Sequence, residues 1–461
     1  MRKISLYIRG VKTADLKAVD TYVRRLVFAL PKPGHKPGKL WKALFFIIFI
    51  FVFIPNVLAE DIALTLDEAV FLALRDNRNI QIGASDIEKA KSKIKEAWSV
   101  VYPSLAVNID KDRTSHLMDK PYSTTEIHAG LKQNIFQSGR IYNSIKQSEY
   151  SKQVQEALYD KEKIEVILNV KKAFCTIMLS EYFLDLNSKV LKNSEMHLDF
   201  TKARYKKGEA SQLDIENATA SLDDARKVYE VSLNQVEASK ELLRNLLYLQ
   251  ESVNVNVVGT FTYTPKEVMF DKALLKAMSD RPEIKQYEAK LRADEHALGM
   301  AKAGNLPEVY LTLDSYSGDR FITTTGITTS KWKNYNVLGL NFSWPIFDGF
   351  ATKAKIEQAI VDLKQTKMLK EKTIQDIVLE LKNAYLGLKN SISSLDSAES
   401  DIKFYKNNLI SIKKKYKEGI ASSLDFDDAD LKYKLSIFNK QQALYDYIIA
   451  KSSLDKAEGG M

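Results

Sequence analysis

Hydrophobic residues recur along much of this chain at the spacing of an amphipathic helix. From residue 140 to residue 207 there is neither glycine nor proline. Within this run the apolar positions are three or four residues apart, as in Ile167, Val170, Phe174, Ile177 and Leu184. Charged residues fill the other faces, as in a helix packed along a coiled-coil seam. The pattern predicts a helix over about 140–207, which would be about 100 Å long at 1.5 Å per residue.

Glycine ends this long helical pattern and a second one like it. A helical pattern resumes after Gly208 and continues over about 211–250, so Gly208 is expected to lie in a turn between antiparallel helices. The same arrangement is expected around Gly419. The remaining predicted helices span about 79–101, 283–305, 350–417 and 423–456. The chain therefore contains two predicted helical hairpins.

Four other segments alternate apolar and polar residues with the period of a β-strand. Leu105, Val107 and Ile109, for example, alternate with more polar neighbours. The predicted strands span about 103–112, 122–136, 307–318 and 333–347. Each pair encloses a polar loop, so each half of the chain contributes one β-hairpin with an apolar face and a mostly polar face.

These two hairpins have two interpretations. One is a half-buried sheet in a soluble protein. The other is a barrel, but four strands cannot close one, because the smallest membrane barrels need about eight strands. Two copies would supply eight strands and three copies twelve, and the periodicity does not choose between them. No third apolar layer is evident that would cover the sheet, which favours closure with other subunits.

The two halves of the chain resemble each other. The stretch RYKKGEASQLDIENA at 204–218 matches KYKEGIASSLDFDDA at 415–429 in eight of fifteen positions. Shorter pairs agree in spacing, such as Tyr102-Pro103 with Leu306-Pro307. This predicts an internal tandem duplication, with repeats at 60–250 and 270–458 joined by a linker at 251–269.

Charge and composition narrow the function. The formal net charge is +9, but the first 59 residues contain eleven Lys and Arg against two Asp, and the rest of the chain balances. No nucleic-acid binding is therefore expected. The same leader has an apolar run at 43–54 and ends in Ala59, which predicts a signal peptide over 1–59. A membrane anchor is the other interpretation, although a spanning helix needs about 20 apolar residues.

Candidate catalytic chemistry is scarce. Cys175 is the one cysteine, which excludes an intramolecular disulfide and any multi-cysteine metal site. The five histidines lack metal-ligand spacing, and no zinc-protease or phosphate-loop motif occurs. We expect no enzyme, no cofactor and no metal, and the alternative is an enzyme that lacks a visible motif.

Several motifs taken together carry a family resemblance. They are Leu66-Asp67-Glu68-Ala69 with Ala73, Tyr102-Pro103, Ile346-Phe347-Asp348-Gly349, and the two glycine turns ending in Leu-Asp. Over residues 62–458 the chain resembles the TolC family of outer-membrane efflux proteins. The resemblance implies an α+β membrane protein: a homotrimer whose twelve-stranded β-barrel lies in outer-membrane lipid and continues as a long antiparallel α-helical coiled-coil tunnel in the periplasm.

The resemblance also implies function and partners. A protein of this family is a passive exit duct of a tripartite efflux or type I secretion system. It is opened at its periplasmic tip by a periplasmic adaptor (membrane fusion) protein and a proton-driven or ATP-driven inner-membrane pump. The middle linker would form an equatorial belt. The alternative is an exported, non-channel coiled-coil protein with a structural or adaptor role, although two equivalent hairpins are unlike an adaptor. The cargo is not predicted.

The glycine turns contain the candidate site residues. Ser211 with Asp214, and Ser422 with Asp425, form the S-x-x-D pattern of a capped helix start. Capping explains Asp214 and most of Asp425. It does not explain the extra acids Asp428 and Asp430, whose counterparts in the first repeat are Asn217 and Thr219. Asp425 and Asp428 are three residues apart, hence on one helix face.

The resemblance assigns roles to these turns. It implies that Asp425 and Asp428 form acidic rings at the periplasmic aperture, and that Tyr416 bonds to Asp214 to hold the gate closed. Tyr416 packed at a helix end is the other interpretation. Ala421 replaces an arginine that assists this contact in the best-known members, so a different lock is expected. The candidate adaptor-docking tips are Gly208, Glu209, Ala210, Ser211, Gly419, Ile420, Ala421 and Ser422.

Overall fold

The computed structural model describes residues 60–114, 122–265, 269–323, 326–418 and 420–460. The expected signal peptide and Gly419 lie outside these residues. The helices are α3 (Leu66–Asp76), α4 (Arg78–Ser99), α5 (Arg140–Lys206), α6 (Gln212–Leu246), α7 (Phe270–Asp280), α8 (Pro282–Lys302), α9 (Ala351–Lys417) and α10 (Ser423–Ala457), with a 3-10 turn η1 at Ala303–Asn305. The strands are β1 (Glu60–Leu64), β2 (Ser104–Thr114), β3 (Tyr122–Phe136), β4 (Val253–Val257), β5 (Glu308–Thr323) and β6 (Gly326–Ser343).

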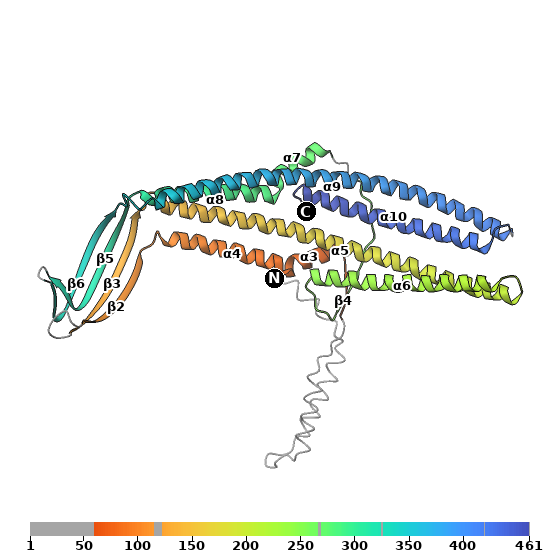
Figure 1. The fold of residues 1–461 in the computed structure, drawn as a ribbon, viewed down its shortest axis with the longest axis horizontal. Helices are drawn as coiled ribbons and strands as arrows, with labels where there is room; N and C mark the ends of the chain where they lie inside the picture. Colours follow the sequence, from red (N-terminus) through yellow and green to blue (C-terminus); the bar gives the residue numbers. More distant parts are fainter. Residues whose placement is uncertain (1–59, 115–121, 266–268, 324–325, 419, 461) are drawn as a thin grey trace, which may run out of the picture. The chain divides into compact units, whose positions relative to one another are not determined.

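Two helical hairpins make up most of these residues. α5 and α9 each have 67 residues, and each turns back into a helix of 35 residues, α6 and α10 respectively. Figure 1 shows the two hairpins running side by side, with their turns at one end and the sheet at the other. Val170, Phe174 and Ile177, three of the apolar positions that predict α5, are buried in it. Among the described helices, none has a stretch long and apolar enough to cross a membrane.

Four strands form one antiparallel sheet in the order β2-β3-β5-β6 (Figure 1). One row of this sheet is leucine across all four strands, because Leu105 pairs with Leu131, Leu131 with Leu313, and Leu313 with Leu338. Facing residues of paired strands lie on the same side, so the leucines share one face. Leu105 and Leu338 are each 71% exposed. Within the described chain this apolar face is uncovered, and β2 and β6 each have a single neighbouring strand.

The opposite face of the sheet is polar. One of its rows is Asn108, His128, Tyr316 and Tyr335. The His128 ring stacks on Tyr316 with 4.5 Å between ring centroids, and Tyr316 stacks on Tyr335 with 4.8 Å. Nε2 of His128 also lies 2.9 Å from Oδ1 of Asp314. This contact between His128 and Asp314 runs diagonally between the strands, because Asp314 is paired with Gly130. A Cβ on Gly130 would lie 2.7 Å from the same Asp314 oxygen.

The two larger of three hydrophobic clusters among the described residues hold the helices near the middle of the hairpins. The first joins α3, α5 and α6 to the short parallel sheet of β1 and β4, through residues such as Ala73, Phe174 and Val255. The second joins α7, α9 and α10 through residues such as Ala277 and Tyr447. The linker after β4 reaches the second core, because the Tyr447 hydroxyl donates a hydrogen bond of 2.6 Å to the Thr264 carbonyl.

Equivalent contacts occur at the two short-helix junctions. Asn77, between α3 and α4, is buried and its side-chain amide donates to the Leu246 carbonyl at the end of α6. Arg281, between α7 and α8, is buried and its guanidinium donates to the carbonyls of Lys456 and Ala457 at the end of α10. In each half, a polar side chain thus satisfies carbonyls that the end of a helix leaves without intrahelical partners.

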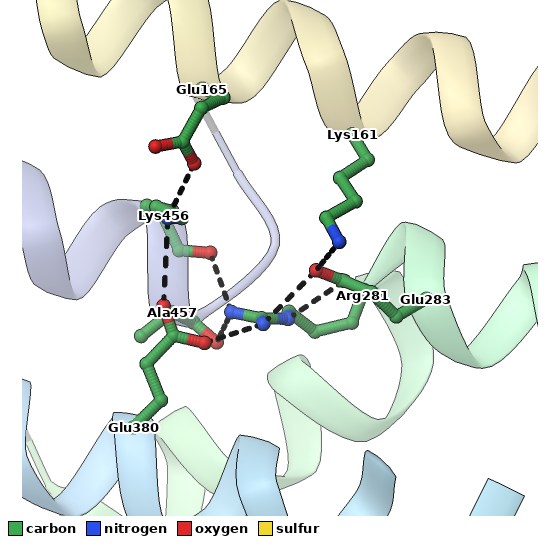
Figure 2. Close-up of polar contacts among 7 residues, drawn as sticks. All are labelled: Lys161, Glu165, Arg281, Glu283, Glu380, Lys456 and Ala457. Atoms are coloured by element: carbon green, nitrogen blue, oxygen red, sulfur yellow. Dashed lines mark hydrogen bonds and ion pairs between the residues drawn. The ribbon is translucent and has the colours of Figure 1, made fainter. Parts of the chain in front are cut away.

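Arg281 belongs to a charged network that joins four helices (Figure 2). Its members are three cations and three carboxylates: Lys161, Arg281, Lys456, Glu165, Glu283 and Glu380. Nη2 of Arg281 lies 2.6 Å from Glu380 on α9, and its Nε lies 3.1 Å from Glu283 on α8. Lys456 on α10 lies 2.6 Å from Glu165 on α5. The network therefore ties the two hairpins together with no net charge.

Several elements differ from the sequence expectations. The strand expected over about 333–347 runs from 326 to 343, and its partner reaches Thr323. Residues 344–347 leave the strand because Pro345 has no backbone N–H to donate to a ladder. The pairing of β1 with β4 was not predicted, since five-residue strands separated by nearly 200 residues leave no local hairpin signal.

Candidate functional site

The first hairpin turn follows from backbone geometry. α5 ends at Lys206, and Gly208 then takes a φ of +77°, a left-handed conformation that favours glycine. A Cβ on Gly208 would meet nothing within 4 Å, so the backbone angle alone explains the glycine. Ser211 caps α6 by a reciprocal pair of bonds with Asp214, and Ser422 caps α10 in the same way with Asp425.

These caps determine the state of two of the candidate acids. Hydrogen bonds from the Ser211 backbone and hydroxyl hold the pKa of Asp214 below its ordinary value. Hydrogen bonds from the Ser422 hydroxyl and backbone do the same for the pKa of Asp425. Both carboxylates are exposed. Each is therefore an ionised group at the positive start of a helix.

The other acids of α10 have different partners. Oδ2 of Asp428 accepts a hydrogen bond of 2.7 Å from Lys432. Asp430 accepts one of 3.0 Å from the side-chain amide of Asn193 on α5 and lies 2.6 Å from Lys434. The carboxylate that the sequence singled out without explanation, Asp430, thus connects α10 to α5.

Tyr416 and Asp214 are not hydrogen-bonded to each other in the single chain. The Tyr416 ring stacks on Phe426 with 5.6 Å between centroids, which matches the alternative of a tyrosine packed at a helix end. Asp214 is bonded to Ser211. The Tyr416 hydroxyl has no hydrogen-bond partner in the described part of this chain.

A groove with a volume of about 570 Å³ lies between the two hairpins beside the turns. α5, α6 and α10 line it, and its charged and titratable residues are His197, Arg204, Glu209, Asp214, Asp427, Asp428 and Lys434. Sequence reasoning did not single out His197, Asn193 or Asp427. The unmatched Asp430 was the one signal that pointed toward them. The described residues contain no group of three or more side chains placed to hold a metal ion.

The turns also expose apolar side chains. Ile420 is 73% exposed and Leu424, in the first turn of α10, is 67% exposed. In the other hairpin Leu213 is 63% exposed. Of the expected docking residues, Ala210 and Ala421 are half-buried, whereas Glu209 and Ser211 are exposed. Exposed apolar side chains at the end of a long coiled coil suggest a surface that another protein covers.

Comparison with known proteins identifies the family. A model of the outer membrane efflux protein family matches residues 70–247 and 273–460. The chain belongs to that family. Among curated relatives of this efflux protein, TolC of Escherichia coli is 24% identical over 404 residues, covering 83% of this chain and 80% of TolC. The probable outer membrane lipoprotein SilC of Salmonella typhimurium is 23% identical over 389 residues, covering 81% and 80%.

Solved structures agree on the fold. The CmeC outer membrane channel of Campylobacter jejuni superposes with a TM-score of 0.74 at 18% identity, covering 86% of this chain and 85% of that one. The open state of the MtrE channel of Neisseria gonorrhoeae gives 0.70 at 20% identity, covering 86% and 89%. This efflux protein is thus an outer-membrane channel of the TolC type with a large periplasmic helical domain, and the alternative of a non-channel coiled-coil protein is set aside.

Proposed function

We propose that this efflux protein is the passive exit duct of a tripartite efflux or type I secretion system, with three copies forming one channel and no catalytic step or cofactor. The observation that carries the proposal is the sheet. It has two unpaired edges, β2 and β6, and an exposed leucine row across its four strands. Pairing β6 of one copy with β2 of the next satisfies the edges and turns the leucines outward to lipid.

Tryptophans support this placement in lipid. Trp332 lies on the leucine side of β6 by strand alternation, Trp344 directly follows the last residue of β6, and both are more than half exposed. Twelve residues separate them, which is about 40 Å along a strand and about 30 Å after a tilt of about 40°. Aromatic girdles bound the apolar band of membrane barrels at about this spacing. Three copies give twelve strands, and an eight-stranded dimer is the outcome that a mass measurement must exclude.

The proposal includes a duplicated chain with repeats at 60–250 and 270–458 and a linker at 251–269. Two observations support it. The family model matches two separate segments, one in each half. The buried side chains of Asn77 and Arg281 bond to the ends of α6 and α10 through the equivalent carbonyls of Leu246 and Ala457. The linker lies at the middle of the hairpins, where an equatorial belt is proposed.

The partners act at the turns. A periplasmic adaptor would dock on residues 208–211 and 419–422, and the exposed Ile420, Leu424 and Leu213 give it apolar surface. An inner-membrane pump, driven by protons or by ATP, would supply cargo to the mouth that the adaptor opens. Relatives are named for different cargoes, such as pyoverdine export for OpmQ of Pseudomonas aeruginosa, so the duct itself specifies cargo loosely.

The proposed gate lies at the periplasmic aperture, the mouth of the channel, which the hairpin turns of the three copies would surround. Three copies of Asp425 and Asp428 would place six carboxylates around one axis and concentrate cations there. Asp428 is paired with Lys432 in the single chain, which reduces its contribution unless the lysine turns away. Tyr416 and Asp214 are the proposed gate-holding contacts, and to make that contact the tyrosine hydroxyl must reach the cap of α6.

Single-channel recording tests both the proposed duct and the proposed acidic rings at its aperture. Wild-type protein in a planar bilayer should be cation-selective and blocked by multivalent cations, and the Asp425→Asn, Asp428→Asn variant should lose both properties. Asp223→Asn, at an exposed acid elsewhere on α6, should change neither. Unchanged selectivity in the double variant would remove the acidic rings, whereas a wild type that forms no channel would overturn the duct itself.

A further inference from the structure

We propose that four side chains, Asn193 and His197 on α5 and Asp427 and Asp430 on α10, form an interhelix tie that holds the two hairpins of each chain together beside the mouth. We further propose that protonation of His197 strengthens this tie, so that the channel stays closed more firmly as the periplasm becomes acidic. The inference rests on the proposed function, because it assumes that the mouth opens by separation of the hairpins.

The contacts form two layers between antiparallel helices. Nδ2 of Asn193 donates to Oδ2 of Asp430 over 3.0 Å. Four residues further along α5, Nδ1 of His197 lies 3.2 Å from Oδ2 of Asp427, which is three residues earlier on α10. Spacings of three and four place each pair of residues on a single helix face. Because the helices run in opposite directions, the two contacts are stacked along the same interface.

The tie is specific to α10. The residues of α6 that correspond to Asp427 and Asp430 are Glu216 and Thr219. The Thr219 hydroxyl donates to the Ile215 carbonyl of its own helix and, among the residues that the structure describes, makes no hydrogen bond to another helix. Asp430, an acid with no acidic counterpart in the first repeat, therefore serves the contact between hairpins, a role that capping and the acidic rings leave unassigned.

His197 is the part of the tie that responds to pH. Its Nδ1 is shielded from solvent and, among the described residues, has no well-aligned hydrogen-bond partner, although the Asp427 carboxylate is within reach. Protonation would give this nitrogen an N–H 3.2 Å from the Asp427 carboxylate, and a small rotation of either side chain would complete a charge-assisted hydrogen bond. Histidine is the side chain whose charge normally changes between pH 5 and 8.

The charged groups that line the groove around His197 come from α5, α10, α6 and the first hairpin turn. α10 presents Asp427, Asp428 and Lys434 to the groove. The turn and α6 present Glu209 and Asp214, and α5 itself presents Arg204, whose guanidinium lies 3.6 Å from Glu209. Among these lining groups there are four acids and two bases besides His197. When the imidazole is neutral its ion pair with Asp427 is absent, and of the two contacts of the tie the Asn193–Asp430 hydrogen bond remains.

The experiment compares resting channel opening in planar bilayers at pH 5.5 and pH 8.0, a window in which ordinary carboxylates stay ionised. A partly exposed charge pair changes an equilibrium about two- to fivefold. Wild type should therefore open at least about twofold less often at pH 5.5. His197→Gln and Asp427→Asn should remove this dependence and open at pH 5.5 as wild type does at pH 8.0. Asn193→Ala should open more often at both pH values and keep the dependence.

His296→Gln is the control, because this histidine lies on α8 and bonds to Asn143 far from the mouth. It should behave as wild type. If His197→Gln and Asp427→Asn keep the wild-type pH dependence, the tie is overturned while the duct stands. If wild type forms a channel whose opening does not change between the two pH values, the pH part is overturned. Absence of any wild-type channel overturns the proposed function, and the tie with it.

Discussion

Replacing Arg281 by alanine tests the charged network that joins the two hairpins. The Arg281 side chain is 5% exposed. It contacts Glu283 and Glu380 and donates to the carbonyls at the end of α10 (Figure 2). Arg281→Ala removes all of these contacts at once and leaves two carboxylates behind.

The cost can be estimated from the partners that remain. Removing one member of a buried ion pair typically costs about 3–5 kcal/mol, because the other charge stays buried. Here Glu283 keeps Lys161 at 3.9 Å and Glu380 keeps Lys456 at 3.8 Å. Glu380 is also 38% exposed and can be rehydrated. The expected cost is therefore at the low end, about 3 kcal/mol.

Hydrogen exchange measured by mass spectrometry reports this loss of stability locally, peptide by peptide. A local loss of about 3 kcal/mol corresponds to exchange faster by roughly 100-fold in the peptides that contain the start of α8 and the end of α10. Arg292→Ala is the matched control, since Arg292 is on the same helix and pairs with Glu295 at 3.0 Å but is 63% exposed. It should accelerate exchange about fivefold at most. Equal effects of the two variants would refute a buried, energetically important network.

Three further predictions concern single positions. Gly318→Ala would press a Cβ against the backbone carbonyl of Thr125 on the neighbouring strand, so we expect less assembled oligomer on a gel run without heating, and wild-type yield would contradict the close approach. Burial raises the pKa of the Cys175 thiol to about 11, so maleimide labelling at pH 7.5 should be slow until the protein is denatured, and rapid native labelling would contradict this. Because the pKa of Asp214 is lower in the folded protein than its ordinary value of 3.8, the carboxylate stabilises the helix cap fully at pH values above 3.8. This stabilisation is lost as the pH falls through the lower pKa of the folded state. Exchange at residues 208–211, corrected for intrinsic rates, should therefore rise only below about pH 4, and Ser211→Ala should lose this dependence.

The long helices and their turns are the part of the fold that sequence reasoning could predict. A run without glycine or proline and with apolar residues every three or four positions leaves few alternatives to a long helix, and α5 spans Arg140–Lys206. Gly208 marks a turn because its backbone angle is unfavourable for other residues. The sheet order was beyond such reasoning, because the β3–β5 pairing joins strands from different halves of the chain.

The site was predictable only in part, for a similar reason. The S-x-x-D caps are local patterns, and both are present at Ser211 and Ser422. The partner of Asp430 is Asn193, which lies 237 residues earlier and is found only when the hairpins are packed together. The network around Arg281 likewise depends on four helices meeting. Long-range polar contacts between helices leave no periodic trace in a single sequence.

Three copies of the chain are proposed to close one barrel through the edges β2 and β6. This closure is tested by the mass of the detergent-purified mature protein in native mass spectrometry, with conductance of the same preparation in a planar bilayer. We expect a complex of three chains that conducts ions. A monomer that is soluble without detergent, or a stable dimer of eight strands, would contradict it.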